Sequence, residues 1–261
     1  MGEVTLEAMK VHAATSPARG LRFMAMCWES GEPPTYAEFV DAVQQATAFA
    51  CNDMARNPKL HASKSEDELT DVIAGILRAY GFEASFDSMV GGHCDLKVSR
   101  HEDFLWLAEA KKHTGHSWLW QGYQQLSTRY QPGDPNSSHG GMLIYCFKPD
   151  TVKQMASWKA YMASKNPALV FPAGGSGRLA GMFLSEHFSP RSGLPQLVLH
   201  YPVALYFSPA DKKATSAKKV AVKSPVLKKV AVAKKKSAKS APAKKSGVSK
   251  KTAPAATRHK K

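Results

Sequence analysis

The chain lacks the features that mark disulfide-stabilised, secreted and membrane-spanning proteins. It has only 4 cysteines in 261 residues, and their spacing matches no disulfide framework or paired metal motif. No apolar run is long enough to span a bilayer, and the N-terminus has no basic and then apolar pattern typical of a signal peptide. We therefore expect a cytoplasmic protein with free thiols and no membrane partner.

Residues 208–261 lack aromatic side chains and almost all acidic ones. This segment holds 18 of the 36 Lys and Arg residues and a single acid, Asp211, whereas the preceding 207 residues hold 18 basic and 20 acidic side chains. A chain of Lys, Ala, Ser, Pro and Val cannot bury enough apolar surface to offset its ordering entropy. The sequence therefore predicts a disordered basic tail.

The tail is also repetitive, with Lys-Lys-Val-Ala-Val at both 218–222 and 228–232. It resembles the lysine-rich tails of linker histones and of bacterial histone H1-like proteins. This resemblance implies sequence-independent DNA binding driven by counterion release, which would concentrate DNA around the body and place the protein at the nucleoid. A solubility or localisation tail is the alternative. The tail lysines expected to contact DNA are Lys218, Lys219, Lys228, Lys229, Lys234, Lys235 and Lys236.

Three parts follow from composition and periodicity: a helical segment at 1–60, one α/β domain at 61–207, and the tail at 208–261. Within the first part, residues 36–56 are predicted to form a helix behind a Gly-Glu-Pro-Pro loop. An apolar stripe along this helix indicates buried packing, with a partner-binding or dimer face as the alternative. The stripe consists of Phe39, Val40, Val43, Ala46, Thr47 and Ala50.

Two predicted strands carry the chemistry of the central domain. Residues 104–112 read as a buried strand, so Glu109 and Lys111, two positions apart, point to the same face. Residues 91–99 have strand character of their own, and the short polar segment 100–103 is suited to turning the chain back. Asp95 is therefore expected beside Glu109 on the neighbouring antiparallel strand.

Two carboxylates brought together in this way repel each other, and a hard divalent cation removes that repulsion. Mg²⁺ is the expected ion, with Mn²⁺ as a substitute. Such an ion polarises a phosphate and lowers the pKa of a bound water, while the amine of Lys111 can position that water or neutralise developing charge. Asp95, Glu109 and Lys111 thus predict phosphodiester hydrolysis.

The pattern Asp95 … Glu109-Ala110-Lys111 resembles that of the PD-(D/E)XK, or restriction-endonuclease-like, nuclease superfamily over about residues 63–150. The resemblance implies an α/β fold with an αβββαβ core around a mixed sheet, extended here by extra C-terminal strands. It also implies Mg²⁺ held by Asp95, Glu109 and the backbone carbonyl of Ala110, with Lys111 as the catalytic amine.

The helix predicted from Glu66 to Tyr80 begins after Ser65 with carboxylates in its first turn. Many members of the superfamily carry a glutamate here that reaches the metal or its waters. Glu68 is the glutamate expected in this role, because it is better placed near the buried seam of the helix than Asp67. Glu66 is the alternative. These acids could instead serve only to complement the helix dipole.

The next predicted helix, 117–130, carries glutamines, and superfamily members often place one near the metal or the phosphate. Gln125 is the closest match, although its five-residue step to Tyr130 departs by one from the Q-x-x-x-Y pattern of RecB-like branches. The alternative is that the glutamines are ordinary polar positions. Trp118, Trp120 and Tyr123 could stack on unpaired bases, although helical spacing favours core packing.

Five histidines lie near the expected site, but their spacing matches no zinc motif. Lys112 and His113, directly after Lys111, are expected to contact DNA, and His113 or His116 could move a proton. The remaining elements are a central buried strand at 140–147, a helix at 151–165, and two strands at 179–188 and 196–207.

The leading hypothesis is a Mg²⁺-dependent deoxyribonuclease, expected to be an endonuclease, in restriction, phage defence or DNA repair. One alternative is a non-catalytic, histone-like DNA-binding or scaffold protein that uses a nuclease fold. Another is a nuclease that acts on RNA. A homodimer and partner proteins that supply specificity are further expectations, because a single active site cuts only one strand.

Overall fold

A computed structural model describes residues 35–100, 103–173 and 178–210. These residues belong to one structural unit, which ends at Ala210. The predictions for the basic tail and its seven DNA-binding lysines lie outside the described residues, as do Cys27, His101 and residues 1–34.

The described chain contains α-helices, one π-helix, one 3₁₀ turn and the strands of a single sheet. The helices are α3 (Tyr36–Arg56), α4 (Pro58–His61), α5 (Glu66–Ala79), α6 (His116–Gln125), the π-helix Leu126–Tyr130, the 3₁₀ turn Pro135–Ser137 and α7 (Thr151–Lys165). The strands are β1 (Glu83–Met89), β2 (His93–Arg100), β3 (Phe104–Lys112), β4 (His139–Cys146), β5 (Phe183–Phe188) and β6 (Pro195–Ala204).

The strands form one mixed six-stranded sheet in the order β1-β2-β3-β4-β6-β5. β1, β2 and β3 are antiparallel neighbours, whereas β4 runs parallel to both β3 and β6. β5 closes the far edge antiparallel to β6. The chain passes through α5, β1, β2, β3, α6 and β4 in that order before α7 and the last two strands extend the fold.

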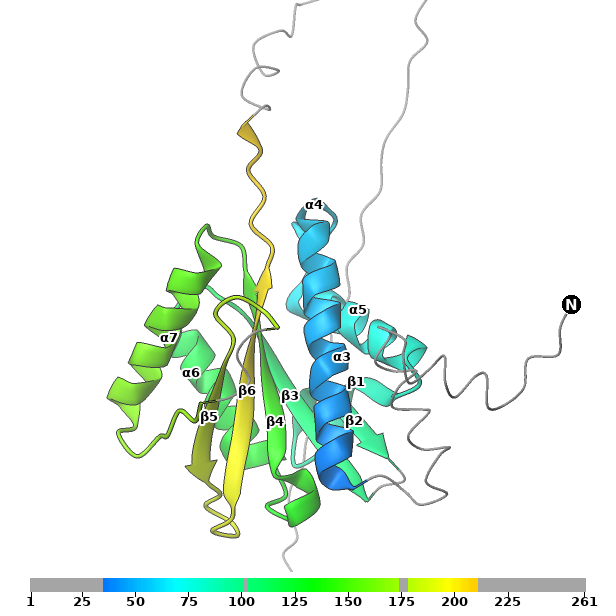
Figure 1. Ribbon diagram of the computed structural model, residues 1–261, viewed down its shortest axis with the longest axis vertical. Coiled ribbons are helices and arrows are strands. Elements are labelled where there is room, and N and C mark those ends of the chain that lie inside the picture. The colour runs from blue at the N-terminus through cyan, green and yellow to red at the C-terminus, as the bar shows by residue number, and fades with distance from the viewer. Residues whose placement is uncertain (1–34, 101–102, 174–177, 211–261) are drawn as a thin grey trace, which may run out of the picture. The chain divides into compact units, whose positions relative to one another are not determined.

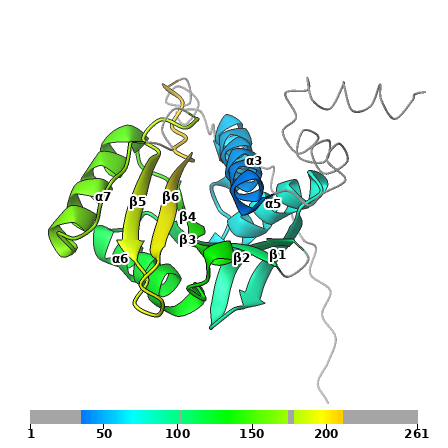
Figure 2. The same ribbon diagram turned by 60° about the horizontal axis from the view of Figure 1, so that its bottom comes forward.

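Helices cover both faces of the sheet, with α3 and α5 on one face and α6 and α7 on the other (Figures 1 and 2). A hydrophobic cluster fills each interface. The first joins α3 and α5 to alternate residues of the central strands, including Trp106 and Leu143. The second joins α6 and α7 to the opposite residues, including Leu107 and Met142. This alternation follows from the two-residue period of a strand buried on both sides.

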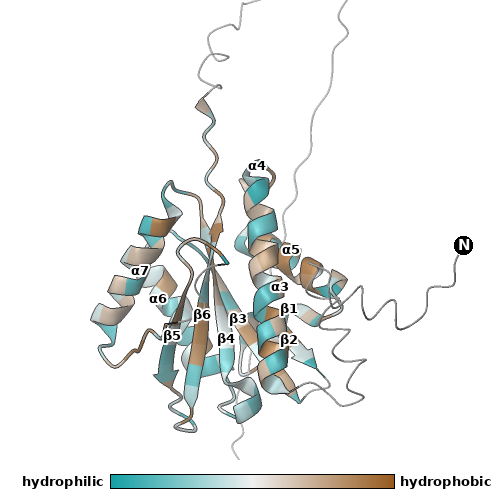
Figure 3. Cartoon of the chain, viewed as in Figure 1, coloured by the Kyte–Doolittle hydropathy of each residue, from teal (hydrophilic) through white to brown (hydrophobic). Residues whose placement is uncertain are grey.

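Residue hydropathy follows the same layers. Apolar segments appear on β6, and the helices show both apolar and polar positions (Figure 3). Each of the six positions in the predicted α3 stripe is buried. The helix is therefore part of the core of the α/β body, and its apolar stripe is packing, as the sequence indicates.

Most predicted elements are confirmed. α3, β3 and α7 have the expected bounds, and the strands expected at 91–99, 140–147, 179–188 and 196–207 appear as β2, β4, β5 and β6. The α/β class, the mixed sheet, the N-terminal helix and the two C-terminal strands are thus confirmed. The helix expected at 117–130 differs, since it changes from α to π geometry after Gln125.

Two smaller expectations concern the cysteines and membrane spans. Among the described cysteines, Cys51, Cys94 and Cys146 are free and buried. No helix in the described ranges combines the length and apolarity needed to cross a membrane.

Candidate active site

The candidate site lies where β3 extends beyond its partner β2. The two strands pair from Leu96 with Ala108 to Arg100 with Phe104, so the edge of β3 from Glu109 onward has no β2 residue paired with it. Along that edge, two side-chain carboxylates accept hydrogen bonds from the backbone amides of β3. The amide of Ala110 donates to Asp95 Oδ2 at 2.7 Å, and the amide of Lys112 donates to Glu66 Oε2 at 2.6 Å.

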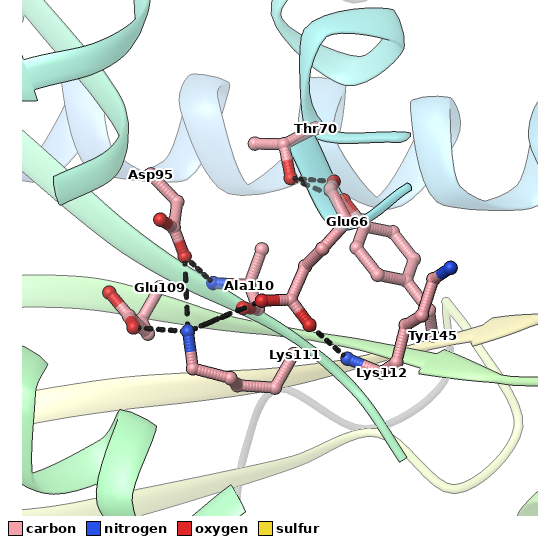
Figure 4. A network of polar contacts seen from close by, with 8 residues as sticks. All are labelled: Glu66, Thr70, Asp95, Glu109, Ala110, Lys111, Lys112 and Tyr145. Atoms are coloured by element: carbon pink, nitrogen blue, oxygen red, sulfur yellow. Dashed lines mark hydrogen bonds and ion pairs between the residues drawn. The ribbon is translucent and has the colours of Figure 1, made fainter. Parts of the chain in front are cut away.

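Lys111 places its ammonium at the point where the oxygens of this site converge (Figure 4). Its Nζ lies 2.5 Å from Glu109 Oε1 and 3.0 Å from the carbonyl oxygen of Ala110. Glu66 Oε1 and Asp95 Oδ2 are 3.5 and 3.6 Å away. Three carboxylates and one backbone carbonyl, from α5, β2 and β3, therefore surround a single positive charge.

The register of β2 and β3 explains why Asp95 and Glu109 share this cluster. The pairing ends with Leu96 and Ala108, so Asp95 and Glu109 are the next residues on the two strands and lie together where the strands separate. The sequence-based prediction that Asp95, Glu109 and Lys111 lie together is confirmed.

Burial shapes the charge state of the cluster. Glu109 is 1% exposed and Lys111 is 6% exposed. Burial, helped by the negative charge of Asp95, raises the pKa of Glu109 to about 7, and burial also raises the pKa of Asp95. Burial alone would lower the pKa of Lys111, but the carboxylates of Asp95 and Glu109 outweigh it and raise that pKa. The ammonium therefore stays charged at neutral pH.

The cluster has more negative charge than Lys111 can balance. Glu109 Oε2 is buried and has no hydrogen-bond partner within the described chain, and such an atom carries the full desolvation penalty of an unpaired acceptor. Hard oxygen donors with excess negative charge are the donors that Mg²⁺ and Mn²⁺ prefer. Asp95, Glu109, Glu66 and the Ala110 carbonyl thus fit a divalent cation chemically.

The ammonium of Lys111 occupies the position among these oxygens that a divalent cation would take. In keeping with this, no group of three or more His, Cys, Asp and Glu side chains within the described residues has metal-binding geometry. The fit accordingly requires Lys111 Nζ to move away from the carboxylates, which its flexible four-carbon stem allows.

Helix α6 packs directly on Lys111. A Cβ atom added at Gly122 would lie 2.9 Å from Lys111 Cγ and 3.1 Å from its Cε, so any larger residue here would require the Lys111 stem to shift. Four residues earlier on the helix, the Trp118 ring centroid is 5.4 Å from Lys111 Nζ, within the range of a cation–π contact. The helix therefore confines the Lys111 stem to a narrow space over β3.

The π-helix gives a structural account of the unusual Gln125 to Tyr130 spacing. The amide of Gln131 donates to the carbonyl of Leu126, five residues earlier, at 3.4 Å. In this wider turn, residues five apart lie on one face, as residues four apart do in an α-helix. Tyr130 is buried, and besides burial the charges of Glu109 and Asp95 raise its pKa, so its phenol lies in the electric field of the site.

Gln125 itself is half-buried and lies one turn after Gly122, on the helix face that includes Trp118 and Gly122. Its side chain makes no hydrogen bond within the described residues, so it is not tied to the carboxylates. Gln125 therefore lies on the face of α6 that contacts Lys111, but its side chain is not part of the polar network around Lys111.

The expectation for Glu68 is wrong in its placement. Glu68 is exposed, and its carboxylate accepts a hydrogen bond from the amide of Ser65 at 2.6 Å while its own amide donates to Ser65 Oγ. This reciprocal capping box uses the carboxylate at the helix terminus, away from the cluster. Glu66, the competitor, is the acid that reaches Lys111 and Lys112.

A sequence signal for Glu66 was present. Leu69, Thr70 and Ile73 form the buried seam of α5, and Glu66 precedes them by three, four and seven residues, which places it on the same helical face. Thr70 extends the network inward, since its hydroxyl contacts the Tyr145 hydroxyl at 2.9 Å (Figure 4).

Lys112 and His113, expected to contact DNA, both lie beside the cluster. The Lys112 ammonium donates to the carbonyl of Lys64 and lies 5.3 Å from the Phe147 ring centroid. Neither ring nitrogen of His113 has a hydrogen-bond partner in the described chain, and burial lowers the pKa of this histidine. Its ring centroid is 5.5 Å from that of His116.

Comparisons with protein-family models, with curated proteins and with solved structures found no match to this chain.

Proposed function

We propose that this protein is a metal-dependent nuclease of the PD-(D/E)XK, restriction-endonuclease-like class. The observation that carries the proposal is the convergence of Asp95, Glu109, Glu66 and the Ala110 carbonyl on one cationic position at an open strand edge. The order α5–β1–β2–β3–α6–β4 supports it, because it agrees with the αβββαβ core expected of that class.

The π-helix adds independent support. With residues five apart on one face, Gln125 and Tyr130 stand in the relation that a Q-x-x-x-Y pair has on an ordinary α-helix. The one-residue departure in the sequence is then compensated by the geometry of the helix.

Phosphodiester hydrolysis is the reaction this site would support. Asp95, Glu109, Glu66 and the Ala110 carbonyl would hold Mg²⁺ or Mn²⁺. A bound ion of this kind supplies charge that polarises a phosphate and lowers the pKa of a coordinated water. Asp95 and Glu66 also keep β3 in place through the amides of Ala110 and Lys112.

Lys111 has the remaining role. Displaced from the carboxylates but confined by Gly122 and Trp118, its ammonium stays beside the reacting phosphate. There it neutralises negative charge as it develops on the phosphate oxygens and holds the attacking water. DNA is the proposed substrate, and the basic tail, which lies outside the described residues, would bring it to the site without reading its sequence.

The test is cleavage of supercoiled plasmid, single-stranded DNA and single-stranded RNA by the full chain with Mg²⁺ or with EDTA. We expect Mg²⁺-dependent cutting that falls about a hundredfold to a thousandfold in Lys111→Ala and Asp95→Ala, since removing one charge-stabilising group costs on the order of 10²–10³ in rate. Lys153→Ala, an exposed lysine on α7, is the matched control and should cut at the wild-type rate.

Three outcomes contradict parts of the proposal. Tight DNA binding with no cutting by any of the proteins favours the non-catalytic, histone-like alternative. Cutting that survives EDTA and both substitutions assigns the activity to another site or to a contaminant. Cleavage of RNA alone replaces DNA as the substrate while leaving the site intact.

A further inference from the structure

A second site adjoins the first through helix α6. A cavity of about 380 Å³ lies between α6, the start of the π-helix, and the loops around Asn166 and Phe188. Its volume is at the lower end of the range for small-molecule sites. Tyr123 lines this cavity, and Gly122, its neighbour in sequence, packs on Lys111. One helix therefore borders both the carboxylate cluster and the cavity.

Aromatic rings form a rigid wall of the cavity. Trp120 and Tyr123 are stacked, with ring centroids 5.4 Å apart and an interplanar angle of 28°. The Tyr123 hydroxyl hydrogen-bonds at 2.9 Å to Nδ1 of His187, which also lines the cavity, and this bond fixes the orientation of the ring. Tyr123 is buried whereas Trp120 is half-buried, so Trp120 is the indole that a ligand can reach.

Neutral polar groups stand beside this wall. The amides of Gln124 and Asn166 and the hydroxyl of Thr128 line the cavity. Asn166 Oδ1 already accepts a hydrogen bond from the amide of Ala168 at 3.0 Å, which leaves its NH₂ group to donate. No Lys, Arg, Asp or Glu is among the described residues that line the cavity. The lining thus has no charged group to recognise a phosphate, and it suits a neutral, planar ring with a hydrogen-bonding edge.

We propose that this cavity binds an unpaired nucleobase of the substrate, an inference that rests on the proposed nuclease function. Stacking on an aromatic ring is available to every base, and amides can pair with the edge that an unpaired base exposes. A base in the cavity and a phosphate at the carboxylate cluster would belong to one strand held along α6. The substrate class is therefore single-stranded or locally unpaired nucleic acid.

Neutral nucleosides are the appropriate probe, because they carry no phosphate and the basic tail has no electrostatic attraction for them. Adenosine, guanosine, cytidine and thymidine would be titrated into the full chain in EDTA and followed by ligand-observed NMR. We expect saturable binding that weakens about tenfold or more in Trp120→Ala, as the loss of a stacking partner predicts, and that largely persists in Trp120→Phe.

Two further variants keep the result interpretable if Trp120→Ala fails to fold. Ala168→Phe adds a ring at an exposed cavity-lining position and should block binding without removing any core side chain. Phe49→Ala removes an aromatic that is 41% exposed on α3 and should bind as the wild type does. Absence of nucleoside binding in the wild type, or equal binding in all variants, overturns the proposal.

The two proposals can fail separately. Nucleoside binding that depends on Trp120 but without any cleavage of nucleic acid keeps the base site and removes the nuclease. Metal-dependent cleavage with no nucleoside binding keeps the nuclease and removes the base site.

Discussion

The two faces of the sheet are built from different chemistry. Under α3 and α5, the buried layer is almost wholly apolar, and its polar groups include the hydroxyls of Thr47 and Thr70 and the indole N–H of Trp106. Under α6 and α7, the buried layer includes the charges of Glu109 and Lys111 and the imidazole of His200. Buried charge is unfavourable unless it is paired, and even a pair rarely stabilises more than apolar packing does. The first face therefore stabilises the fold by apolar packing almost alone, while the second combines an apolar cluster with buried charged groups.

After the losses expected in Lys111→Ala and Asp95→Ala, the largest expected effect separates two acids of one helix turn. Glu66→Gln removes a carboxylate from the cluster at the open edge of β3, and we expect Mg²⁺-dependent cleavage to fall about a hundredfold. Glu68→Gln changes an exposed capping residue and should leave the cleavage rate unchanged. Rates of plasmid nicking measured across a range of Mg²⁺ concentrations make the comparison. An equal loss in both variants, or a loss in Glu68→Gln alone, would restore Glu68 to the site.

Glu66 and Glu68 also show how far the site could be predicted from the sequence. Strand periodicity was enough to unite Asp95, Glu109 and Lys111, because a two-residue period leaves only two faces to choose between. On a helix, neighbouring acids differ by about 100° in direction, and the choice depends on which residues are buried. The Ser65-x-x-Glu68 capping pattern assigns Glu68 to the helix terminus, and the buried seam of α5 places Glu66 on the inward face. Taken together, these two patterns favour Glu66 as the acid of the site.

Other features required the tertiary structure. Nothing local in residues 126–130 signals a π-helix, which forms where α6 meets the sheet and the β1–β2 turn. A Cβ atom at Gly91, where φ is +64°, would lie 2.3 Å from the carbonyl oxygen of Arg129, so this turn and the π-helix fit only through glycine. The cavity beside Trp120 likewise joins residues from Trp120 to Pro190, a separation that no local pattern spans.

Substitutions on the apolar face, under α3 and α5, should lower the stability of the fold and leave cleavage unchanged. Phe39 on α3 is 1% exposed, and its ring centroid lies 5.7 Å from that of Phe104. Phe39→Ala is expected to lower the free energy of unfolding by about 3–5 kcal/mol, while cleavage per folded molecule stays at the wild-type level. Urea unfolding measures the first quantity and plasmid nicking the second. Phe49→Ala, on the same helix but 41% exposed, should cost clearly less. A loss of cleavage by folded Phe39→Ala would contradict the division between the faces.

The face under α6 and α7 should also make the protein sensitive to acid. His200 accepts a hydrogen bond from Trp158 Nε1 at its Nδ1, so its Nε2 carries the proton and donates to Ser185 Oγ at 2.9 Å. This tautomer is neutral, and complete burial lowers the pKa of His200 to about 3. Below the unfolded-state pKa of about 6.5, His200 binds a proton in the unfolded chain but stays neutral in the folded protein. The stability contributed by His200 is therefore complete above about pH 6.5 and is lost as the pH falls toward 3.

His200→Gln isolates this contribution, because glutamine can accept from Trp158 and donate to Ser185 without titrating. Between about pH 6.5 and 5, the wild type is expected to lose about 2 kcal/mol more stability than His200→Gln loses, at roughly 1.4 kcal/mol per pH unit for one proton. Urea unfolding of both proteins at several pH values gives the difference directly, and carboxylates common to both cancel. Parallel pH profiles would mean that His200 takes up its proton in the folded protein over the same pH range as in the unfolded chain. The neutral Trp158–His200–Ser185 chain would then be the wrong description of the buried polar layer beneath α7.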